Sequence, residues 1–364
     1  MWWSPAPPVR ERVVVASGVR PFSGGVAVLA VENLCKTHPH RAEPALDGVE
    51  LRARPATICG VFGPAGSGKT SLLRCLAGLD VADSGRVTVS GRPVALRRGR
   101  RRGARRPVGF VPESDALLHE CTVAGNIARP FELAGFDRVA RQVRVAELLE
   151  LTGLRAESHA SLFQLRPEQL RRLQVAQALA AGASVLVLDD VDEHVGSGGG
   201  GALATVLDRV RGELGLTVVL ATDDSEVVRR LCDDVVVLDG GRVLESGPVL
   251  ELLARRRSRT AELLLDPVAA PAVAGPLRAG LPGDACLVDV VLVGYAAVGS
   301  LLPLAVSRFG IAMTYLSGGV VPVAGTLVGR FRVSIAGHGT GRALDWLASQ
   351  RCAVWEVEDP TMAA

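Results

Sequence analysis

Short apolar runs alternate with amphipathic segments over residues 26–264. Runs rich in Val, Leu and Ile that end at Gly or polar residues predict buried strands, at 57–62, 108–111, 185–188, 217–221 and 235–238. Segments with apolar residues three and four positions apart predict helices, at 69–77, 139–152, 167–181, 201–213 and 225–231. This alternation is typical of a mostly parallel sheet covered by helices, and hence of an α/β fold.

The pattern changes after residue 264. Pro, Ala and Gly dominate residues 267–283, PVAAPAVAGPLRAGLPG, which is the composition of a linker. The residues that follow have the pattern strand, helix, strand, strand, helix, strand. The sequence therefore predicts an N-terminal extension, a large domain, a linker and a small C-terminal α+β domain, at 1–25, 26–264, 265–283 and 284–359.

Two stretches without a charge, 290–307 and 311–329, lie in the small domain. Each is nearly long enough for a membrane-spanning helix, which needs about 20 apolar residues. However, Gly, Ser or Pro interrupts both stretches, and only a short Arg-Phe-Gly segment separates them. We therefore predict a strand and a helix for the first stretch and a buried strand hairpin for the second.

Composition restricts the function only slightly. The net charge of +3 over 364 residues is too small to indicate a nucleic-acid binder. The seven cysteines are scattered, without a C-x-x-C pair, so neither a disulfide framework nor a zinc site is indicated. The first 25 residues lack the apolar core of a signal peptide. A reduced, cytosolic setting fits these features best.

One segment is strongly basic, and it contains Gly and Ala but no aromatic residues that would stack on bases. It is either a solvated surface loop or a segment attracted to anionic lipid or to a partner. Its basic residues are Arg97, Arg98, Arg100, Arg101, Arg102, Arg105 and Arg106.

The most specific motif is a Gly-rich turn between a predicted strand and a predicted helix. Residues 63–70, G-P-A-G-S-G-K-T, match the phosphate-binding pattern G-x-x-x-x-G-K-[ST]. Such a turn points backbone N–H groups and a helix N-terminus at a polyphosphate. We expect Lys69 to reach the β- and γ-phosphates and Thr70 to place its hydroxyl on Mg²⁺. The candidate nucleotide-binding residues of this segment are Gly63, Pro64, Ala65, Gly66, Ser67, Gly68, Lys69, Thr70 and Ser71.

A second candidate for Mg²⁺ is Asp189, which follows the apolar run 185–188. A lone acidic residue after a strand is weak support for a metal site. Together with the phosphate-binding turn it is strong support, because carboxylate oxygens suit a hard cation.

The order of these segments resembles the ATPase subunits of ABC transporters over most of the large domain. The resemblance implies a P-loop NTPase fold with a helical subdomain, an ATPase activity, and ATP and Mg²⁺ as cofactors. It also places His38 where an aromatic residue usually stacks on adenine. The matching segments are the domain start at 36–53, the Q-loop region at 108–127, the signature helix at 165–180, Walker B with the D-loop at 185–196, and the switch region at 217–247.

The small domain resembles the NIL domain of methionine importers, on the order of its elements and on the segment FGIAMTYLSGG at 309–319. In that family the NIL domain is a ferredoxin-like, ACT-type module that binds methionine and inhibits transport when cytoplasmic substrate is plentiful. The resemblance implies an importer ATPase at the cytoplasmic face of the membrane. Its implied partners are an integral membrane permease, a second ATPase subunit, expected to be an identical copy, and indirectly an extracytoplasmic substrate-binding protein.

Several residues depart from the family pattern. Glu113 replaces the Q-loop Gln, and its carboxylate is a candidate Mg²⁺ ligand. Asp190 replaces the Glu that polarises the attacking water, and it is one methylene shorter. Asp223 replaces the switch His, so an acceptor stands where a donor to the γ-phosphate is expected. Asp190 remains the candidate catalytic residue.

The signature and the D-loop differ as well. Arg166, Pro167 and Glu168 occupy the Ser-Gly-Gly positions of the signature, and residues 193–196 read Glu-His-Val-Gly in the D-loop. Pro167 removes an N–H donor, and Glu168 adds a negative charge beside a phosphate. We therefore predict that ATP binds, that the dimer closes weakly and that hydrolysis is slow. The alternative is a hydrolysis-deficient regulatory subunit that binds a nucleotide and an amino acid.

Overall fold

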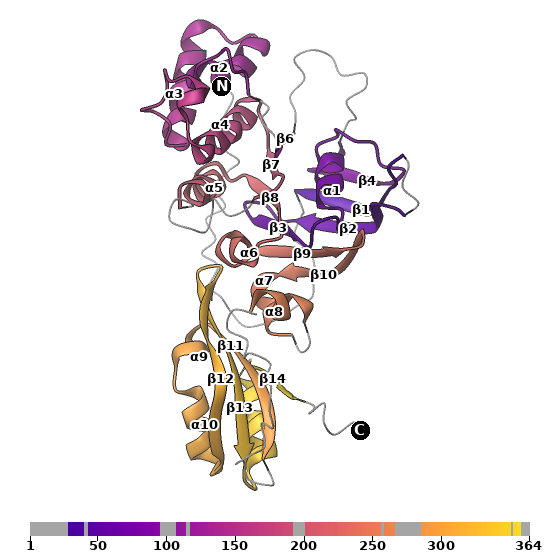
Figure 1. The fold of residues 1–364 in the computed structure, drawn as a ribbon, viewed down its shortest axis with the longest axis vertical. Coiled ribbons are helices and arrows are strands. Elements are labelled where there is room, and N and C mark those ends of the chain that lie inside the picture. Colours follow the sequence, from indigo (N-terminus) through magenta and orange to yellow (C-terminus); the bar gives the residue numbers. More distant parts are fainter. Residues whose placement is uncertain are drawn as a thin grey trace.

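The computed structural model describes residues 28–39, 43–94, 107–113, 117–191, 201–255, 258–265, 285–350 and 352–357. Our predictions for the N-terminal extension, the arginine-rich segment and the linker at 265–283 concern residues outside these ranges, except that Leu265 is described and lies buried at the end of the last helix of the large domain. Figure 1 shows the large domain, from β1 to α8, above the small domain, from β11 to β14.

The large domain is built on a six-stranded sheet with the order β10-β9-β3-β8-β7-β6. The strands from β9 to β6 are parallel, and β10 pairs with β9 in the antiparallel direction. Every residue of β3 and of β7 is buried, because helices cover both faces of the sheet. The predicted parallel sheet is thus confirmed. Its strands are β3 (Ile58–Phe62), β6 (Val108–Val111), β7 (Val185–Leu188), β8 (Thr217–Thr222), β9 (Asp234–Asp239) and β10 (Arg242–Pro248).

A second, antiparallel sheet packs beside it, with the order β2-β1-β4-β5. Its buried side chains join those of α1 and of one face of the central sheet in a common core. Sequence analysis did not predict these strands. They are β1 (Leu29–Lys36), β2 (Leu46–Ala53), β4 (Ser84–Val89) and β5 (Arg92–Pro93).

The helices of the large domain form two groups. A helical subdomain consists of α2 (Val123–Leu133), α3 (Arg138–Leu151) and α4 (Pro167–Ala180), with a short 3₁₀ turn, η1 (Leu162–Gln164). Around the sheet lie α1 (Lys69–Leu76), α5 (Gly201–Leu214), α6 (Ser225–Leu231), α7 (Val249–Leu253) and α8 (Arg259–Leu264). Thr122 and Asp137 begin α2 and α3, because each side chain accepts a hydrogen bond from an N–H group of the first turn. The predicted helices of this domain agree with these elements to within a residue or two.

The small domain has one antiparallel sheet with the order β12-β13-β11-β14, which is the ferredoxin-like order. The predicted succession of strands and helices is confirmed, and the first uncharged stretch contains a strand and helices. The second stretch lies in a hairpin, but the prediction that this hairpin is buried is wrong for its first strand, because only Val323 of that strand is buried. No helix within the described ranges is long and apolar enough to cross a membrane. The elements are β11 (Cys286–Val293), α9 (Tyr295–Val298), α10 (Leu301–Phe309), β12 (Ala312–Val323), β13 (Thr326–Ala336), α11 (Thr340–Ser349) and β14 (Ala353–Glu356).

The tip of the β12–β13 hairpin lies against α6 of the large domain (Figure 1). The amide of Ala324 donates to the carbonyl oxygen of Arg229 at 2.6 Å. Val323 and Val328, on either side of the turn, are fully buried in the same hydrophobic cluster as Leu264 and Leu265 at the end of α8. The two domains therefore share an apolar contact.

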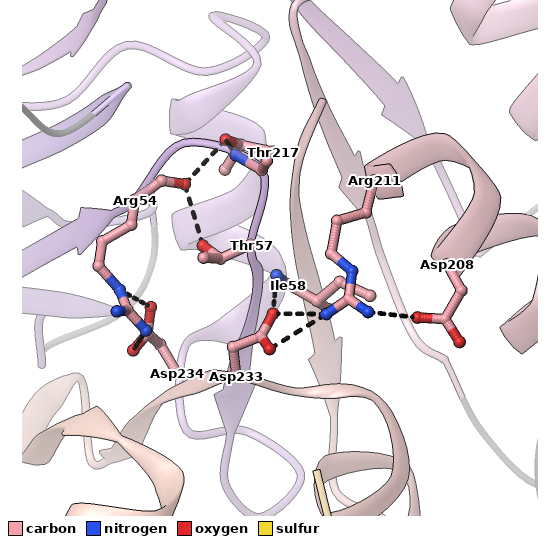
Figure 2. Close-up of polar contacts among 9 residues, drawn as sticks. Arg54, Thr57, Ile58, Asp208, Arg211, Thr217, Asp233 and Asp234 are labelled. Carbon is pink, nitrogen blue, oxygen red and sulfur yellow. Dashed lines mark hydrogen bonds and ion pairs between the residues drawn. The ribbon is translucent and has the colours of Figure 1, made fainter. Parts of the chain in front are cut away.

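Charged residues form hydrogen bonds and ion pairs at the end of the central sheet where the parallel strands begin (Figure 2). Arg54, after β2, donates to both carboxylate oxygens of the buried Asp234 at 2.8 and 2.9 Å. Asp233 accepts from the amide of Ile58 at 2.9 Å and from the guanidinium of Arg211 on α5. These contacts fix the starts of β3 and β9, and so the position of the loops at the opposite ends of these strands.

Candidate nucleotide site

The Gly-rich turn lies at the carboxyl end of β3, directly before α1. At Gly63 a Cβ atom would lie 2.0 Å from the carbonyl oxygen of Leu238, so the backbone passes too close to β9 for any side chain. Gly68 has a φ of 106°, and a Cβ there would lie 2.3 Å from the carbonyl oxygen of Ala45. Only glycine satisfies both positions, so the turn has the shape that the motif predicts.

Helix α1 begins directly after the turn, at Lys69. The first N–H groups of a helix have no partner within the helix and favour an anion. Lys69 donates to the carbonyl oxygens of Gly63 and Pro64, at 2.6 and 3.0 Å. The hydroxyl of Ser67 is buried, and it has no hydrogen-bond partner among the residues that the structure describes. A turn with a cation and unpaired donors of this kind suits a polyphosphate.

Thr70 and Asp189 come together beside the turn. The Thr70 hydroxyl donates to the carboxylate of Asp189 at 3.1 Å, although the two residues are 119 positions apart in the sequence. Burial raises the pKa of Asp189, and the charges of Asp190 and Glu113 raise it further, while the bond from Thr70 lowers it. A cation at this carboxylate would relieve the cost of its charge.

The donor set fits Mg²⁺ when the nucleotide is counted with it. No group of three or more His, Cys, Asp or Glu side chains with metal-binding geometry occurs within the described ranges. Mg²⁺ does not need such a cage, because it is commonly held by one or two protein oxygens together with substrate phosphates and water. Thr70 and Asp189 supply oxygens of this type.

Asp190 follows Asp189 at the end of β7 and has an unusual backbone. Its φ is 52°, in the left-handed region that residues other than Gly rarely adopt. The next amide, of Val191, donates to the carbonyl oxygen of Ala221 on β8 at 2.8 Å. The half-buried side chain of Asp190 is close enough to Asp189 to raise its pKa.

The remaining candidates lie around this centre. Glu113 is exposed just beyond the end of β6, and its negative charge contributes to the raised pKa of Asp189. His38 contacts the hydroxyl of Ser71 in the first turn of α1, with 2.8 Å between Nε2 and Oγ. The structure thus gathers His38, the turn, Asp189, Asp190 and Glu113 at one end of the sheet. Their roles in binding and catalysis stay predictions.

The N-terminus of α4, in the segment that resembles the signature, is bonded within its own chain. Pro167 is the first residue of the helix and has no N–H group. The amide of Arg166 donates to the side-chain oxygen of Gln169 at 2.8 Å, and Gln169 donates in turn to Glu157 at 2.9 Å. Glu168 adds a negative charge in the first turn. This helix end consequently offers few donors to a phosphate.

The switch position is also acidic. Asp223 is exposed directly after β8. Asp224 has a structural role, because its carboxylate accepts from the amide of Glu226 at 2.7 Å and so begins α6. The D-loop segment 193–196 lies outside the described residues.

Sequence analysis missed one residue that contacts this centre. Arg171 on α4 donates to the carbonyl oxygens of Pro112, Asp189 and Asp190. No spacing in the sequence indicates these contacts, since the partners are main-chain atoms of distant segments. The only signal is an arginine in the second turn of a helix that is otherwise expected to pack on the sheet.

Family models and solved structures agree on the class of protein. The model "ABC transporter" matches residues 46–192, and the model "NIL domain" matches residues 286–356. A CbiO1 structure from Clostridium perfringens, part of an ABC transporter complex, has a TM-score of 0.56 at 24% identity and covers 66% of this chain and 96% of that one. The dimeric cassette MJ0796 with ADP and Pi has a TM-score of 0.53 at 24% identity, over 60% and 98%. The fold and the site define an ABC-type ATPase with a C-terminal NIL domain.

Curated relatives identify the family more closely. The methionine import ATP-binding protein MetN of Thermobifida fusca is 38% identical over 86% of this chain and 94% of its own length. MetN 2 of Rhodopseudomonas palustris is 36% identical over 86% of this chain and 85% of its own length. The chain belongs to the family of methionine import ATP-binding proteins.

Proposed function

We propose that this chain is the ATP-binding subunit of an ABC importer for methionine, and that it binds ATP together with Mg²⁺. The observation that carries the proposal is the 3.1 Å contact between Thr70 and Asp189 beside the Gly-rich turn. The names of the relatives support methionine as the transported substrate.

Each residue of the site has a proposed task. Phosphate oxygens replace the carbonyl groups of Gly63 and Pro64 as the partners of Lys69. Mg²⁺ would be held by Thr70, by Asp189, and by Glu113 either directly or through a water. The bound ion would offset the negative charge of the phosphates. His38 packs on the base, next to its contact with Ser71. Asp190 orients the attacking water.

A membrane permease is the proposed partner of the helical subdomain. Phe163 in η1 is 83% exposed, and Leu118 is 37% exposed. The ring of the exposed His119 lies 5.5 Å from that of Phe163, so these two rings form one exposed aromatic patch. Such a patch is typical of a protein contact. The chain then acts at the cytoplasmic face of the membrane, as one of two ATPase copies, with an extracytoplasmic protein that delivers the substrate.

Hydrolysis is proposed to be slow. The Asp190 side chain is one methylene shorter than Glu, and phosphoryl transfer depends chiefly on positioning. Asp223 offers no donor to the γ-phosphate. In a homodimer, each site would also receive an α4 N-terminus that is acidic and bonded within its own chain. These features together reduce stabilisation of the transition state in both sites.

Nucleotide binding and phosphate release, measured side by side on the purified transporter, test the proposal. Fluorescent ATP should bind only with Mg²⁺, and Lys69→Ala should weaken binding by about tenfold or more, as expected for the loss of a charge-assisted phosphate contact. Single-turnover hydrolysis should be slower than in an importer with an intact signature. Absence of nucleotide binding would refute the proposal, and hydrolysis at the rate of an intact ABC ATPase would refute the slow turnover.

The second candidate is a regulatory subunit that binds a nucleotide but does not turn it over. The internally bonded, acidic end of α4 favours it. The same assay separates the two functions. Binding without phosphate release, in the presence of the permease and the substrate-binding protein, identifies the regulator.

Methionine binding by the small domain is tested on the full chain. Calorimetric titration with methionine should release or absorb heat, whereas an amino acid of similar size and different polarity, such as glutamine, should not. A flat methionine titration up to millimolar concentration would contradict this part of the proposal.

A further inference from the structure

Arg171 joins the helical subdomain to the strand ends that carry the acidic residues. Its Nη1 donates to the carbonyl oxygen of Pro112 at 2.5 Å, and its Nη2 donates to those of Asp189 and Asp190 at 3.0 and 2.5 Å. The first partner follows β6, and the other two follow β7. A single half-buried side chain on α4 therefore connects two loops of the site.

The guanidinium group suits this arrangement. It is planar, permanently charged, and has donors in a rigid fork, so it can bind several carbonyl oxygens at fixed angles. A lysine ammonium has fewer donors on a more flexible chain and would satisfy only part of the set. Carbonyl groups in half-buried loops also need partners, so these contacts remove a cost that the loops would otherwise carry.

One of the three contacts holds a strained peptide. Asp190 has a φ of 52°, in the left-handed region, which is unfavourable for L-residues although Asp adopts it more often than most. The peptide between Asp190 and Val191 is bonded at both ends, because its carbonyl accepts from Arg171 and its N–H donates to Ala221 on β8. The backbone from which the Asp190 side chain extends is thereby fixed between α4 and the sheet.

The other two contacts act on the neighbouring acidic residues. Pro112 directly precedes Glu113, and Asp189 is the proposed Mg²⁺ ligand. Arg171 thus anchors the backbone at Asp189 and Asp190 and directly before Glu113.

We infer that Arg171 is a positioning residue, which holds the main chain of Asp189, Asp190 and Pro112 so that their loops present the acidic side chains to MgATP. The inference rests on the proposed function, because it concerns the same site.

The next residue along the helix offers a matched control. Arg172 donates to the carbonyl oxygens of Thr152 and Gly153 at 2.9 and 3.1 Å. These acceptors end α3, so the contact stays within the helical subdomain. Arg172→Gln removes the same charge and the same number of side-chain atoms as Arg171→Gln, but leaves the acidic residues untouched.

The experiment compares the wild-type transporter with Arg171→Gln, Arg171→Lys and Arg172→Gln. We expect Arg171→Gln to lower kcat by about tenfold to a hundredfold, as for an error in positioning, and to change KM for ATP by less than about threefold. Arg171→Lys should recover part of kcat. Arg171→Gln should also need several-fold more Mg²⁺ for half-maximal nucleotide binding. Arg172→Gln should match the wild type in all three measurements.

Several outcomes overturn the inference. The inference is refuted if Arg171→Gln has the same kcat as the wild type. It is also refuted if Arg172→Gln lowers kcat as much as Arg171→Gln does. If Arg171→Gln does not fold, as judged from its melting temperature, wild-type kcat in Arg171→Lys has the same meaning. If the wild type itself releases no phosphate, the proposed ATPase activity is refuted. The role of Arg171 is then tested by the Mg²⁺ concentration needed for half-maximal nucleotide binding. If this concentration is the same in Arg171→Gln as in the wild type, the role of Arg171 is refuted as well.

Discussion

At the scale of single residues, the site combines an intact phosphate-binding turn with altered groups for hydrolysis. Lys69 and Thr70 lie at the Gly-rich turn, and Thr70 contacts Asp189, whereas Asp190 and Asp223 are the acidic residues proposed to replace the groups of hydrolysis. We therefore expect nucleotide binding and turnover to depend on different residues. Substitution at one of these positions should change one property without the other.

Asp190→Glu is expected to speed hydrolysis. The added methylene restores the reach of the carboxylate to an attacking water, and an increase of about tenfold in the single-turnover rate is a reasonable gain for one positioned base. Asp190→Asn, which has the size of Asp190 but no charge, should lower the rate. Nucleotide affinity should stay constant in both variants. A rate that is unchanged in Asp190→Glu would show that Asp223 or the α4 N-terminus limits the reaction.

At the scale of elements, sequence analysis of the large domain predicted the strands that are wholly apolar and missed strands in which apolar and polar residues alternate. Strands such as β7 and β8 are buried on both faces, so their residues form apolar runs that are easily recognised. The antiparallel β2 alternates buried apolar and exposed charged residues, and was not recognised as a strand. The Gly-rich turn and Asp189 were found because one local motif and one strand end identify them. The contacts of Arg171 depend on tertiary packing, which no local pattern contains.

The α8 helix depends on one carboxylate. Glu245 on β10 accepts hydrogen bonds from the hydroxyls of Ser258 and Thr260 and from the amides of Arg259 and Thr260, at 2.6 to 3.0 Å. We expect Glu245→Gln to lower the free energy of unfolding by about 1–2 kcal/mol, the usual cost of a lost helix cap. Urea unfolding measures this loss. Glu262→Gln, in a surface ion pair on the same helix, should cost under about 1 kcal/mol.

The same residue predicts a dependence on pH. Burial acts to raise the pKa of Glu245, but its hydrogen bonds outweigh burial and hold the pKa below its usual value. A carboxyl with a lowered pKa stabilises the folded state above its unfolded pKa, and this stabilisation is lost as the pH falls through the folded pKa. The difference in stability between the wild type and Glu245→Gln should therefore be full at neutral pH and shrink in acid. A difference that is constant from pH 7 to pH 3 would contradict this assignment.

The edge of the central sheet opposite the nucleotide turn depends on an ion pair. Arg54→Ala would leave Asp234, which is 2% exposed, without its bidentate partner. We expect a loss of about 2 kcal/mol, below the usual value for a fully buried pair because the Arg54 side chain is 43% exposed. Arg52→Ala, on an exposed position of β2, should have little effect. Equal melting temperatures for the two variants would show that the ion pair contributes nothing.

At the scale of the whole molecule, the two domains meet through the β12–β13 hairpin. The turn at its tip has positive φ at both Ala324 and Gly325, as in the type I′ turn of a two-residue hairpin. Its amide contact with Arg229 lies on α6, the helix that directly follows the switch position. The small domain thus contacts the helix that follows the switch position.

Val323→Asp should separate the domains. Val323 is fully buried in the cluster that includes the end of α8, so a carboxylate there must either lose its charge or leave the contact. Because residues 267–283 have the composition of a linker, loss of the hairpin contact should leave the small domain joined to the large one by the chain alone, and the radius of gyration measured by small-angle scattering should increase. Val320→Asp, on the same strand and 38% exposed, should leave it unchanged. If the two variants scatter alike, the hairpin contact does not hold the domains together, and any signal from the small domain to the ATPase site must take another path.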